Sequence, residues 1–325
     1  MTNEFDLIAR FFSRPVATGL LGGGDDCALF NVTSGLQVAT SKDLLLEGRH
    51  FFADVDPCSL GHKALAVNLS DLAAMGARPL GCLLGLALPT LNETWVEQFA
   101  QGFYALAETH QCALLGGDTT RSQQGIALSV TVFGEIDPSL AMRRDAAQVG
   151  DDIWVSGALG AADVACRLLA KTLPPNNALL QATRSALEWP TPRVELGQQL
   201  AHYAHAAIDV SDGLLQDLGH LLKASGVGAQ VDEKLLPIHP ALLEGARQTL
   251  DQEALRRALL AGGDLYELCF TAAPAQRLQI EQVGQALHIA LSRIGTITKE
   301  PSLVVYDRAG VALTALPLGF DHFRT

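Results

Sequence analysis

The order of apolar and polar positions along the chain predicts an α/β protein built from two domains. Apolar residues three and four positions apart predict helices at 60–75, 95–109, 161–169, 214–223 and 275–287. Short apolar runs bounded by glycine or polar residues predict strands at 36–40, 81–88, 112–115, 126–136, 153–156, 206–208, 267–271 and 302–306. Because strands and helices alternate, and the strand–turn–helix order restarts after residue 150, we expect two α/β (α+β) halves of similar size.

A polar, irregular stretch separates the two predicted halves. We place an N-terminal domain at 1–137, a connector at 138–150 and a C-terminal α/β domain at 151–325. A chain of 325 residues is long enough for two hydrophobic cores. Within the second half, the stretch 171–177 contains two prolines and two asparagines and is predicted to be a surface loop.

The composition limits the kinds of partner that the protein can bind. Hydrophobic residues make up 48% of the chain and charged residues 18%, which is typical of a well-packed globular protein. The 23 basic and 35 acidic residues give a net charge of −12, and no Lys/Arg cluster is present, so the sequence argues against nucleic-acid binding. An acidic protein can still bind phosphates when cations lie between the two sets of negative groups.

Nothing in the sequence predicts a membrane partner. The first six residues show no basic region followed by an apolar stretch, and the longest apolar segment, 79–89, is short and interrupted by glycines. The six cysteines are scattered, with no Cys-x-x-Cys pair. This pattern favours buried thiols in a reducing cytoplasm over a disulfide scaffold.

Four short, acidic, glycine-rich turns carry the candidate chemistry, and each follows an apolar run typical of a buried strand. The turns are 22–26, 116–120, 208–213 and 262–264, and Asp43 and Asp71 add two more carboxylates. Glycine lets a backbone approach a ligand closely, and carboxylate oxygens are the ligands that magnesium prefers. Because gathered carboxylates repel one another without a cation, the sequence predicts a magnesium–phosphate site.

Asn68 and Asp71 are three positions apart on the predicted helix 60–75, so they share one face of it. Asp71 either belongs to the site or is solvated at the surface. The residues 116–118 directly follow the predicted strand 112–115. The carboxyl end of a strand is where ligand sites of α/β proteins lie, so this position favours a role in binding.

The 209–213 turn precedes the predicted helix 214–223. Ser211 or Asp212 is either an ordinary N-cap or part of a site in which unpaired amide groups and the helix dipole receive a phosphate. In the second interpretation Asp209 and Asp212 hold a metal and Ser211 donates a hydrogen bond. The two roles are compatible.

Two nucleotide-binding motifs are absent from the sequence, and two other polar features are interpreted as structural. The sequence contains no Gly-x-x-x-x-Gly-Lys-Ser/Thr phosphate loop and no protein-kinase signature. His202 and His205 lack an acidic or cysteine partner nearby in the sequence, and we interpret them as structural. The charged stretch 253–257 is interpreted as a solvated helix face.

Taken in order, these motifs closely resemble the thiamine-monophosphate kinase family over nearly the whole chain. The resemblance rests on Gly24-Asp25-Asp26-Cys27-Ala28-Leu29, Asp43 with Gly48-Arg49-His50-Phe51, the block from Lys63 through Asn68 and Asp71 to Ala77, Gly116-Gly117-Asp118-Thr119-Thr120-Arg121, Asp209-Val210-Ser211-Asp212-Gly213-Leu214 and Gly319-Phe320-Asp321-His322-Phe323. It implies a two-domain fold like that of aminoimidazole ribonucleotide synthetase and selenophosphate synthetase. It also implies a homodimer formed by the N-terminal halves, with ATP near the interface.

The resemblance further implies a set of site residues. Magnesium ligands are expected at Asp26, Ser41, Lys42, Asp43, Asp71, Asp118, Asp209 and Asp212. ATP contacts are expected from Tyr104, Gly117, Asp118, Arg144 and Ser211. Contacts to thiamine monophosphate are expected from His50, Asp264 and Phe320.

The chain departs from the family pattern at four positions, three of them among these site residues. Lys42 replaces the threonine of Ser-Thr-Asp and offers a metal only its backbone carbonyl. In Gly262-Gly263-Asp264-Leu265-Tyr266-Glu267, Asp264 is one methylene shorter than the usual glutamate and Leu265 removes a carboxylate. Phe320 keeps an aromatic ring where the family often has tyrosine. We also considered that the Lys42 ammonium supplies part of the charge of one magnesium ion.

The implied reaction transfers the γ-phosphoryl group of ATP to thiamine monophosphate, with several magnesium ions and no dedicated general base. The alternatives are a related enzyme or a catalytically silent nucleotide-binding or metal-sensing protein. A selenophosphate synthetase would need a reactive cysteine in an N-terminal glycine-rich segment, and none precedes Cys27. A hydrogenase-maturation relative would need a C-terminal cysteine, whereas this chain ends Phe323-Arg324-Thr325.

Overall fold

The structure is a computed structural model that describes residues 4–16, 19–22, 26–244 and 250–320. The chain divides into two compact units, which are described separately. The first unit contains Met1–Leu72 and Ala77–Ser139, and the second contains Ala73–Gly76 and Leu140–Thr325.

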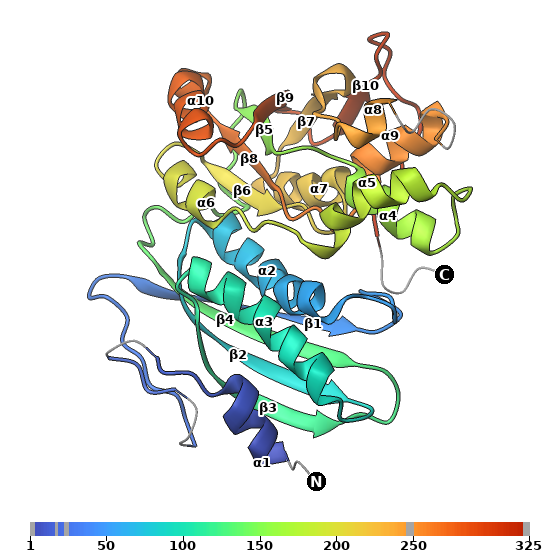
Figure 1. The fold of residues 1–325 in the computed structure, drawn as a ribbon. Helices are drawn as coiled ribbons and strands as arrows, with labels where there is room; N and C mark the ends of the chain where they lie inside the picture. Colours follow the sequence, from blue (N-terminus) through green and yellow to red (C-terminus); the bar gives the residue numbers. More distant parts are fainter. Residues whose placement is uncertain (1–3, 17–18, 23–25, 245–249, 321–325) are drawn as a thin grey trace. The chain divides into compact units, whose positions relative to one another are not determined.

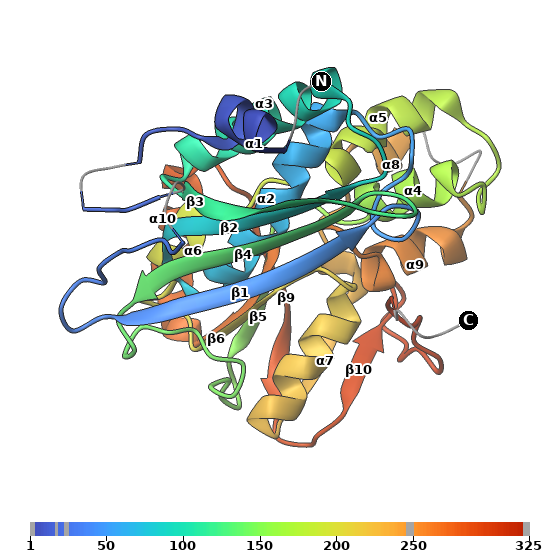
Figure 2. The same cartoon turned by 90° about the horizontal axis from the view of Figure 1, so that it is seen from below.

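The first unit is built on a four-stranded sheet (Figure 1). Its elements are α1 (Glu4–Leu7), η1 (Ile8–Phe12), β1 (Gln37–Leu46), α2 (Pro57–Met75), β2 (Arg78–Leu88), α3 (Glu93–Thr109), β3 (Ala113–Arg121) and β4 (Ala127–Ile136). The strand order is β1-β4-β2-β3, with β2 and β3 parallel and the other neighbours antiparallel. Figure 2 shows the four strands side by side in this order.

The two faces of this sheet differ in burial. Side chains alternate between the faces along a strand, and in β1 the residues Ser41, Asp43 and Leu45 lie on the more buried face. Asp43 pairs with Val130 of β4, which is fully buried. Figure 1 shows α2 and α3 lying over this sheet. The alternate residues of β1 form the open face, where Leu44 is 54% exposed.

Two glycines allow α2 and α3 to pack closely. A side chain at Gly61 would place its Cβ 2.0 Å from the carbonyl oxygen of Phe99, and one at Gly102 would place it 1.8 Å from that of Cys58. Only a residue without Cβ fits at either position. Phe99 and Phe103 fill the space beside this contact and are fully buried, so the helix that carries Asn68 and Asp71 is firmly held.

The second unit is built on a six-stranded sheet. Its elements are β5 (Asp152–Ser156), α4 (Ala161–Leu169), α5 (Asn177–Glu188), α6 (Val194–Leu200), β6 (Ala206–Asp209), α7 (Leu214–Ser225), β7 (Gly228–Asp232), η2 (Glu233–Leu235), α8 (Ala241–Glu244), α9 (Gln252–Ala261), β8 (Leu268–Ala272), η3 (Pro274–Gln276), α10 (Arg277–Ala286), β9 (Leu291–Thr298) and β10 (Leu303–Tyr306). The order is β10-β7-β9-β5-β8-β6, and only β10 and β7 are parallel.

The predicted helices and strands are present, but three boundaries differ in ways that matter for the site. β1 continues to Leu46, so Ser41, Lys42 and Asp43 lie inside the strand rather than after it. β3 likewise includes 116–118, which the sequence predicts to be a turn after the strand. The 262–264 turn follows helix α9 and not a strand. Periodicity over a few residues cannot locate these ends, because pairing with a neighbouring strand sets them.

The sequence did not predict α5, α6, β7 or β9, and the charged stretch 253–257 lies in α9, where Leu259 and Leu260 are buried. All six cysteines are free thiols. Among the described residues, no helix is both long and apolar enough to cross a membrane.

Candidate active site

In the first unit, β1 and α2 bring three of the predicted metal ligands together. The hydroxyl of Ser41 donates a hydrogen bond to Oδ2 of Asp71 over 2.5 Å. The backbone N–H of Asp43 donates to Oδ1 of Asn68 over 2.9 Å, and Asn68 Nδ2 donates to the carbonyl oxygen of Ala64 over 3.0 Å. The fully buried Asn68 thus fixes β1 against the helix. Asp71 therefore belongs to this cluster rather than to a solvated surface.

The electrostatics of this cluster favour a cation. Burial, and then the nearby charge of Asp71, raise the pKa of Asp43 to about 6. Both causes disfavour the charged carboxylate when no cation is present. Two carboxylates and a hydroxyl are hard oxygen donors, which suit magnesium. The donor set and its charge repulsion therefore fit a bound divalent ion.

Lys42 does not share this environment. It lies between Ser41 and Asp43 in a regular strand, so its side chain points to the opposite face of the sheet and is exposed. The interpretation that its ammonium replaces part of a magnesium charge beside Asp43 disagrees with this geometry. Its backbone carbonyl is the group that remains for a metal.

Asp118 lies at the other edge of the same sheet. It pairs with Gly85 of β2, and two strands separate β3 from β1. Three strand spacings amount to about 14 Å, so Asp118 and Asp43 of one chain do not ligate the same ion. A Cβ at the neighbouring Gly117 would lie 1.8 Å from the carbonyl oxygen of Leu84. Strand packing alone therefore requires this glycine.

Asp26 and His50, also predicted site residues of the first unit, lie outside the cluster of Ser41, Asp43 and Asp71. Asp26 is exposed. It lies between Leu21 and Leu29, whose backbones form hydrogen bonds with each other. Residues 23–25 of the predicted turn lie outside the described residues. The backbone N–H of Leu46 donates to Nδ1 of His50 over 2.9 Å. This bond sets the orientation of the imidazole directly after β1 and leaves the proton of the neutral ring on Nε2.

Tyr104 on α3 is buried, and its hydroxyl has no hydrogen-bond partner among the described residues. Burial raises the pKa of Tyr104 to about 12, and the charge of Arg14 opposes this shift. The guanidinium carbon of Arg14 lies 3.7 Å from the Tyr104 ring centroid, and Glu108 holds the guanidinium with an ion pair of 2.5 Å. A buried phenol with an unused donor is consistent with a ligand contact.

Among the described residues, no group of three or more histidine, cysteine or acidic side chains is close enough to hold a metal. The predicted ligands of the first unit thus comprise one compact pair of carboxylates, Asp43 and Asp71, with Ser41. Asp26 and Asp118 lie elsewhere in that unit.

In the second unit, the 209–213 turn is organised differently from the sequence prediction. Oδ2 of Asp217 accepts hydrogen bonds from the backbone N–H groups of Ser211, Asp212 and Gly213, at 3.0, 3.0 and 3.1 Å. These amides are therefore not available to a phosphate. The N-cap of α7 is Gly213, with no side-chain cap, so neither Ser211 nor Asp212 is the N-cap. The sequence analysis missed Asp217. Its position in the first turn of the predicted helix, where an acidic side chain can accept hydrogen bonds from backbone N–H groups, is the signal that could have found it.

The same turn brings together two of the three predicted substrate residues, Asp264 and Phe320. The backbone N–H of Asp264 donates to the carbonyl oxygen of Ser211 over 2.8 Å, and that of Phe320 donates to the carbonyl oxygen of Asp212 over 2.9 Å. Residues that the sequence predicts to bind metal, nucleotide and substrate, and that are distant in the sequence, thus meet at one turn. Asp209 is the last residue of β6 and is buried, whereas Asp212 is partly exposed.

The loop that carries Asp264 has an unusual backbone. Asp264 and Tyr266 have positive φ angles of 59° and 54°, and the Tyr266 hydroxyl donates to Oδ1 of Asp264 over 3.1 Å. Leu265 between them is buried, where a carboxylate would need a partner. Non-glycine residues adopt this conformation only when their surroundings enforce it, and such residues cluster at functional sites.

A buried ion pair that the sequence analysis missed supports the end of this loop. Nε of Arg193 lies 2.7 Å from Oε2 of Glu267, and its Nη2 lies 2.5 Å from Oε1. The Ser156 hydroxyl donates to Oε2 of Glu267 over 2.5 Å and accepts from the backbone N–H of Leu268 over 2.9 Å. Every oxygen of the buried carboxylate is paired, which is the arrangement that a buried charge requires.

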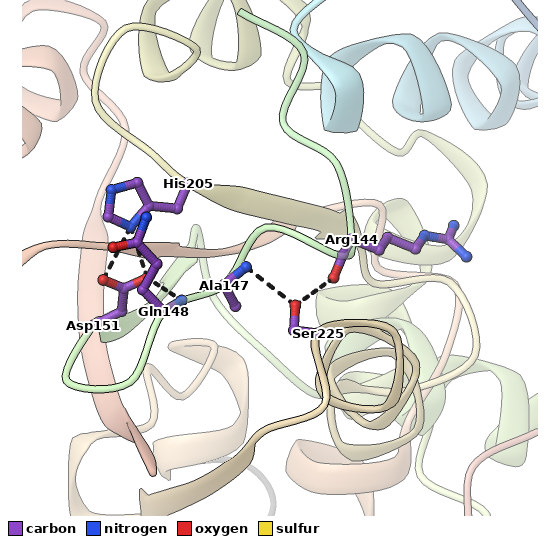
Figure 3. Close-up of polar contacts among 6 residues, drawn as sticks. All are labelled: Arg144, Ala147, Gln148, Asp151, His205 and Ser225. Atoms are coloured by element: carbon purple, nitrogen blue, oxygen red, sulfur yellow. Dashed lines mark hydrogen bonds and ion pairs between the residues drawn. The ribbon is translucent and has the colours of Figure 1, made fainter. Parts of the chain in front are cut away.

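The connector places Arg144 in the second unit. The Ser225 hydroxyl donates to the carbonyl oxygen of Arg144 over 2.8 Å and accepts from the N–H of Ala147 over 3.1 Å (Figure 3). The guanidinium of Arg144 extends away from these contacts. Figure 3 also shows His205, whose Nδ1 lies 2.9 Å from Oδ2 of Asp151, in agreement with a structural role for this histidine.

Known proteins resemble the chain over its full length. Residues 24–136 match the family described as AIR synthase related protein, N-terminal domain, and residues 148–308 match AIR synthase related protein, C-terminal domain. The chain is 41% identical over 330 residues to the thiamine-monophosphate kinase of Salmonella typhimurium, and 40% identical over 332 residues to that of Escherichia coli K12. Each alignment covers 99% of this chain and 98% of the relative.

Solved structures show the same similarity. The crystal structure of thiamine-monophosphate kinase from Stenotrophomonas maltophilia K279a aligns with a TM-score of 0.83 and 46% identity, over 94% of this chain and 95% of that chain. AaThiL complexed with AMPPCP and TMP aligns with a TM-score of 0.78 and 29% identity, over 90% and 89% of the two chains.

Proposed function

The chain belongs to the thiamine-monophosphate kinase family, and we infer that it transfers the γ-phosphoryl group of ATP to thiamine monophosphate, giving thiamine diphosphate and ADP. It is thus an ATP-dependent kinase of thiamine biosynthesis with two AIR synthase related domains. The observation in this chain that carries the assignment is the 209–213 turn, to which the backbones of Asp264 and Phe320 are bonded.

The proposed assignment of the site residues extends this function. Proposed magnesium ligands are Asp26, Ser41, the carbonyl of Lys42, Asp43, Asp71, Asp118, Asp209 and Asp212. Proposed ATP contacts are Tyr104, Gly117, Asp118, Arg144 and Ser211. Proposed contacts to thiamine monophosphate are His50, Asp264 and Phe320. Because Asp118 and Asp43 lie at opposite edges of the sheet, we propose that these two residues of one chain hold different ions.

The charge balance of the site supports this assignment. Two polyanions must approach one another, and bound magnesium would neutralise their charge and that of the transferred group. Asp43 and Asp71 repel one another in the protein alone, so their repulsion favours an incoming cation. Phe320 offers an aromatic face to a flat heterocycle. The hydroxyl of Tyr104, which has no hydrogen-bond partner in the described part of the chain, offers a donor to the nucleotide.

The reaction needs no general base. The acceptor is a phosphate monoester, whose second pKa is about 6, so its oxygen is already ionised at neutral pH. His50 accepts a backbone hydrogen bond at Nδ1, which suits a positioning contact rather than proton abstraction. The residues of the chain therefore position the two phosphates in line, and the reaction proceeds by direct transfer.

We also propose that the protein is a cytoplasmic homodimer whose N-terminal region, 1–137, carries the nucleotide site and the dimer interface, with 138–150 as connector and 151–325 as the second domain. Val38, Leu44 and Leu46 are 51%, 54% and 39% exposed in β1. Large apolar side chains at this exposure favour contact with a second copy. The six free thiols are consistent with a reducing compartment.

One assay tests the function directly. Purified protein is incubated with ATP, magnesium and thiamine monophosphate, and thiamine diphosphate is separated by chromatography. We expect stoichiometric formation of thiamine diphosphate and ADP. A protein that binds ATP but forms no thiamine diphosphate would instead be a silent nucleotide-binding or metal-sensing protein.

A further inference from the structure

One buried carboxylate has no role in the site assignment above, although it contacts the centre of the site in the second unit. Asp217 lies in the first turn of α7 and is 3% exposed. We infer that Asp217 is a positioning residue that sets the 209–213 turn and, through it, the backbone segments of Asp264 and Phe320. This inference rests on the proposed function of those two residues.

The inner edge of the turn is bound by a single oxygen atom. Three successive N–H groups, of Ser211, Asp212 and Gly213, point to Oδ2 of Asp217 at 3.0 to 3.1 Å. Three donors that converge on one acceptor atom leave the turn little freedom. The conformation of the residues that hold Asp209 and Asp212 thus depends on this carboxylate.

The outer edge of the turn is bound by the segments that carry the substrate contacts. The carbonyl oxygens of Val210, Ser211 and Asp212 accept hydrogen bonds from the N–H groups of Tyr266, Asp264 and Phe320, at 2.9, 2.8 and 2.9 Å. Amides point inward to Asp217 and carbonyls point outward to the substrate segments. A displacement of the turn therefore moves both segments.

A second contact binds only one of these segments. Nε2 of Gln216 donates to the carbonyl oxygen of Phe320 over 2.7 Å. Gln216 precedes Asp217 in α7 but does not contact the turn amides in any described hydrogen bond. Variants of Asp217 and Gln216 therefore distinguish an effect on the whole turn from an effect on Phe320 alone.

A role limited to helix capping would have a different consequence. Loss of a cap lowers stability but leaves the affinities of the folded protein unchanged. Loss of a positioning residue misplaces the proposed ligands, and a misplacement of about 1 Å costs on the order of a hundredfold in rate. Steady-state constants for both substrates therefore distinguish the two roles.

The experiment compares Asp217→Ala, Asp217→Asn and Gln216→Ala with the wild type. We expect Asp217→Ala to raise the KM values of ATP and of thiamine monophosphate, each by about tenfold or more. Asp217→Asn keeps an oxygen that can accept hydrogen bonds from the turn amides, so both KM values stay within about threefold of the wild type. Gln216→Ala raises only the KM of thiamine monophosphate. Calorimetric titration with thiamine monophosphate should rank the variants in the same order by binding affinity, without turnover.

Asp152→Ala is the matched control. Asp152 is also a buried carboxylate of the second unit, 2% exposed, and it pairs with Arg277 at 2.6 Å. Its loss should lower the melting temperature while both KM values stay unchanged. Exchange of the amide hydrogens of Ser211, Asp212 and Gly213 should be faster in Asp217→Ala than in Asp152→Ala, since only the first variant removes their acceptor.

Several results would overturn the inference. A folded Asp217→Ala with both KM values within twofold of the wild type shows that the residue only caps the helix, and an Asp217→Asn as impaired as Asp217→Ala excludes a pure acceptor role. If Asp217→Ala does not fold, Asp217→Glu keeps the acceptor but shifts it by one methylene, and unchanged KM values in that variant overturn the inference. A wild type that forms no thiamine diphosphate contradicts the proposed function instead, and the calorimetric ranking still tests Asp217.

Discussion

The Ser41 hydroxyl lies 2.5 Å from Oδ2 of Asp71 and donates a hydrogen bond to it. This bond joins the middle of β1 to the C-terminal part of α2 and places Asp71 near Asp43, whose pKa is raised by burial and then by the charge of Asp71. The first unit therefore holds two carboxylates in an arrangement that is unfavourable without a cation. Carboxylates with a pKa shifted by burial and a like charge cluster at functional sites.

The first prediction concerns the pH dependence of magnesium binding. A cation binds the charged form of Asp43, and this group is mostly protonated below its pKa of about 6. Magnesium affinity should therefore fall by about tenfold between pH 7.5 and pH 5. Calorimetric titration in the absence of nucleotide measures it. Asp43→Asn should remove this pH dependence, and equal wild-type affinities at the two pH values would contradict the prediction.

The second prediction concerns the stability of the metal-free protein. A carboxylate whose pKa is raised in the folded state stabilises that state below the unfolded pKa of about 3.8, and this contribution is lost as the pH rises through about 6. At pH 8, Asp71→Asn removes one source of the repulsion and should stabilise the metal-free protein by on the order of 1 kcal/mol.

Urea unfolding in a chelator measures this change. The same variant should bind magnesium more weakly than the wild type, because it has lost a ligand. A lower unfolding midpoint for Asp71→Asn in the chelator would show that the carboxylate pair is not under repulsion.

The third prediction concerns Lys42. Because its side chain lies on the opposite face of β1 from Asp43, Lys42→Thr should change magnesium affinity by less than about twofold. The backbone carbonyl, which is the proposed ligand, is kept. The same titration measures this, and a clear gain in affinity or in the number of bound ions would restore the interpretation that the ammonium replaces a magnesium charge.

The fourth prediction concerns assembly. Leu44→Glu replaces one of the three exposed apolar side chains on the open face of β1 by a charge, and burial of a charge at an interface is costly. Light scattering should give a mass of 34.5 kDa for this variant and twice that value for the wild type. Leu278→Glu introduces the same charge at a residue of α10 that is 62% exposed, and it should remain a dimer. A monomeric wild type would contradict the proposed interface.

The fifth prediction concerns the support of the Asp264 loop. A Cβ at Gly157, where φ is +64°, would lie 1.9 Å from Oε1 of Glu267, which Arg193 and Ser156 hold in place. Gly157→Ala should destabilise the protein by about 2–3 kcal/mol.

Gly219→Ala is the matched control, because nothing lies within 4 Å of the added Cβ in α7. It should stabilise the helix by about 0.5–1 kcal/mol. Thermal unfolding compares the two variants, and equal melting temperatures would show that Glu267 moves freely away from the new methyl group.

The amino-acid sequence by itself determined most of the helices and strands, and it singled out the acidic residues proposed for the site other than Asp217. Hydrophobic periodicity is a local property, so the helices that carry Asp71 and Tyr104 and the strand before Asp209 could be located from neighbouring residues. The motif resemblance also identified the family, because the residues that carry the chemistry occur in the same order along the whole chain.

Only the tertiary structure decided how those residues are oriented. Pairing of β1 with β4 extends the strand through Ser41–Asp43 and turns Lys42 to the other face, and sheet order places Asp118 at the opposite edge. The turn amides go to Asp217 and not to a phosphate. These outcomes depend on which backbone groups of distant segments become hydrogen-bond partners, and no pattern of neighbouring residues encodes that choice.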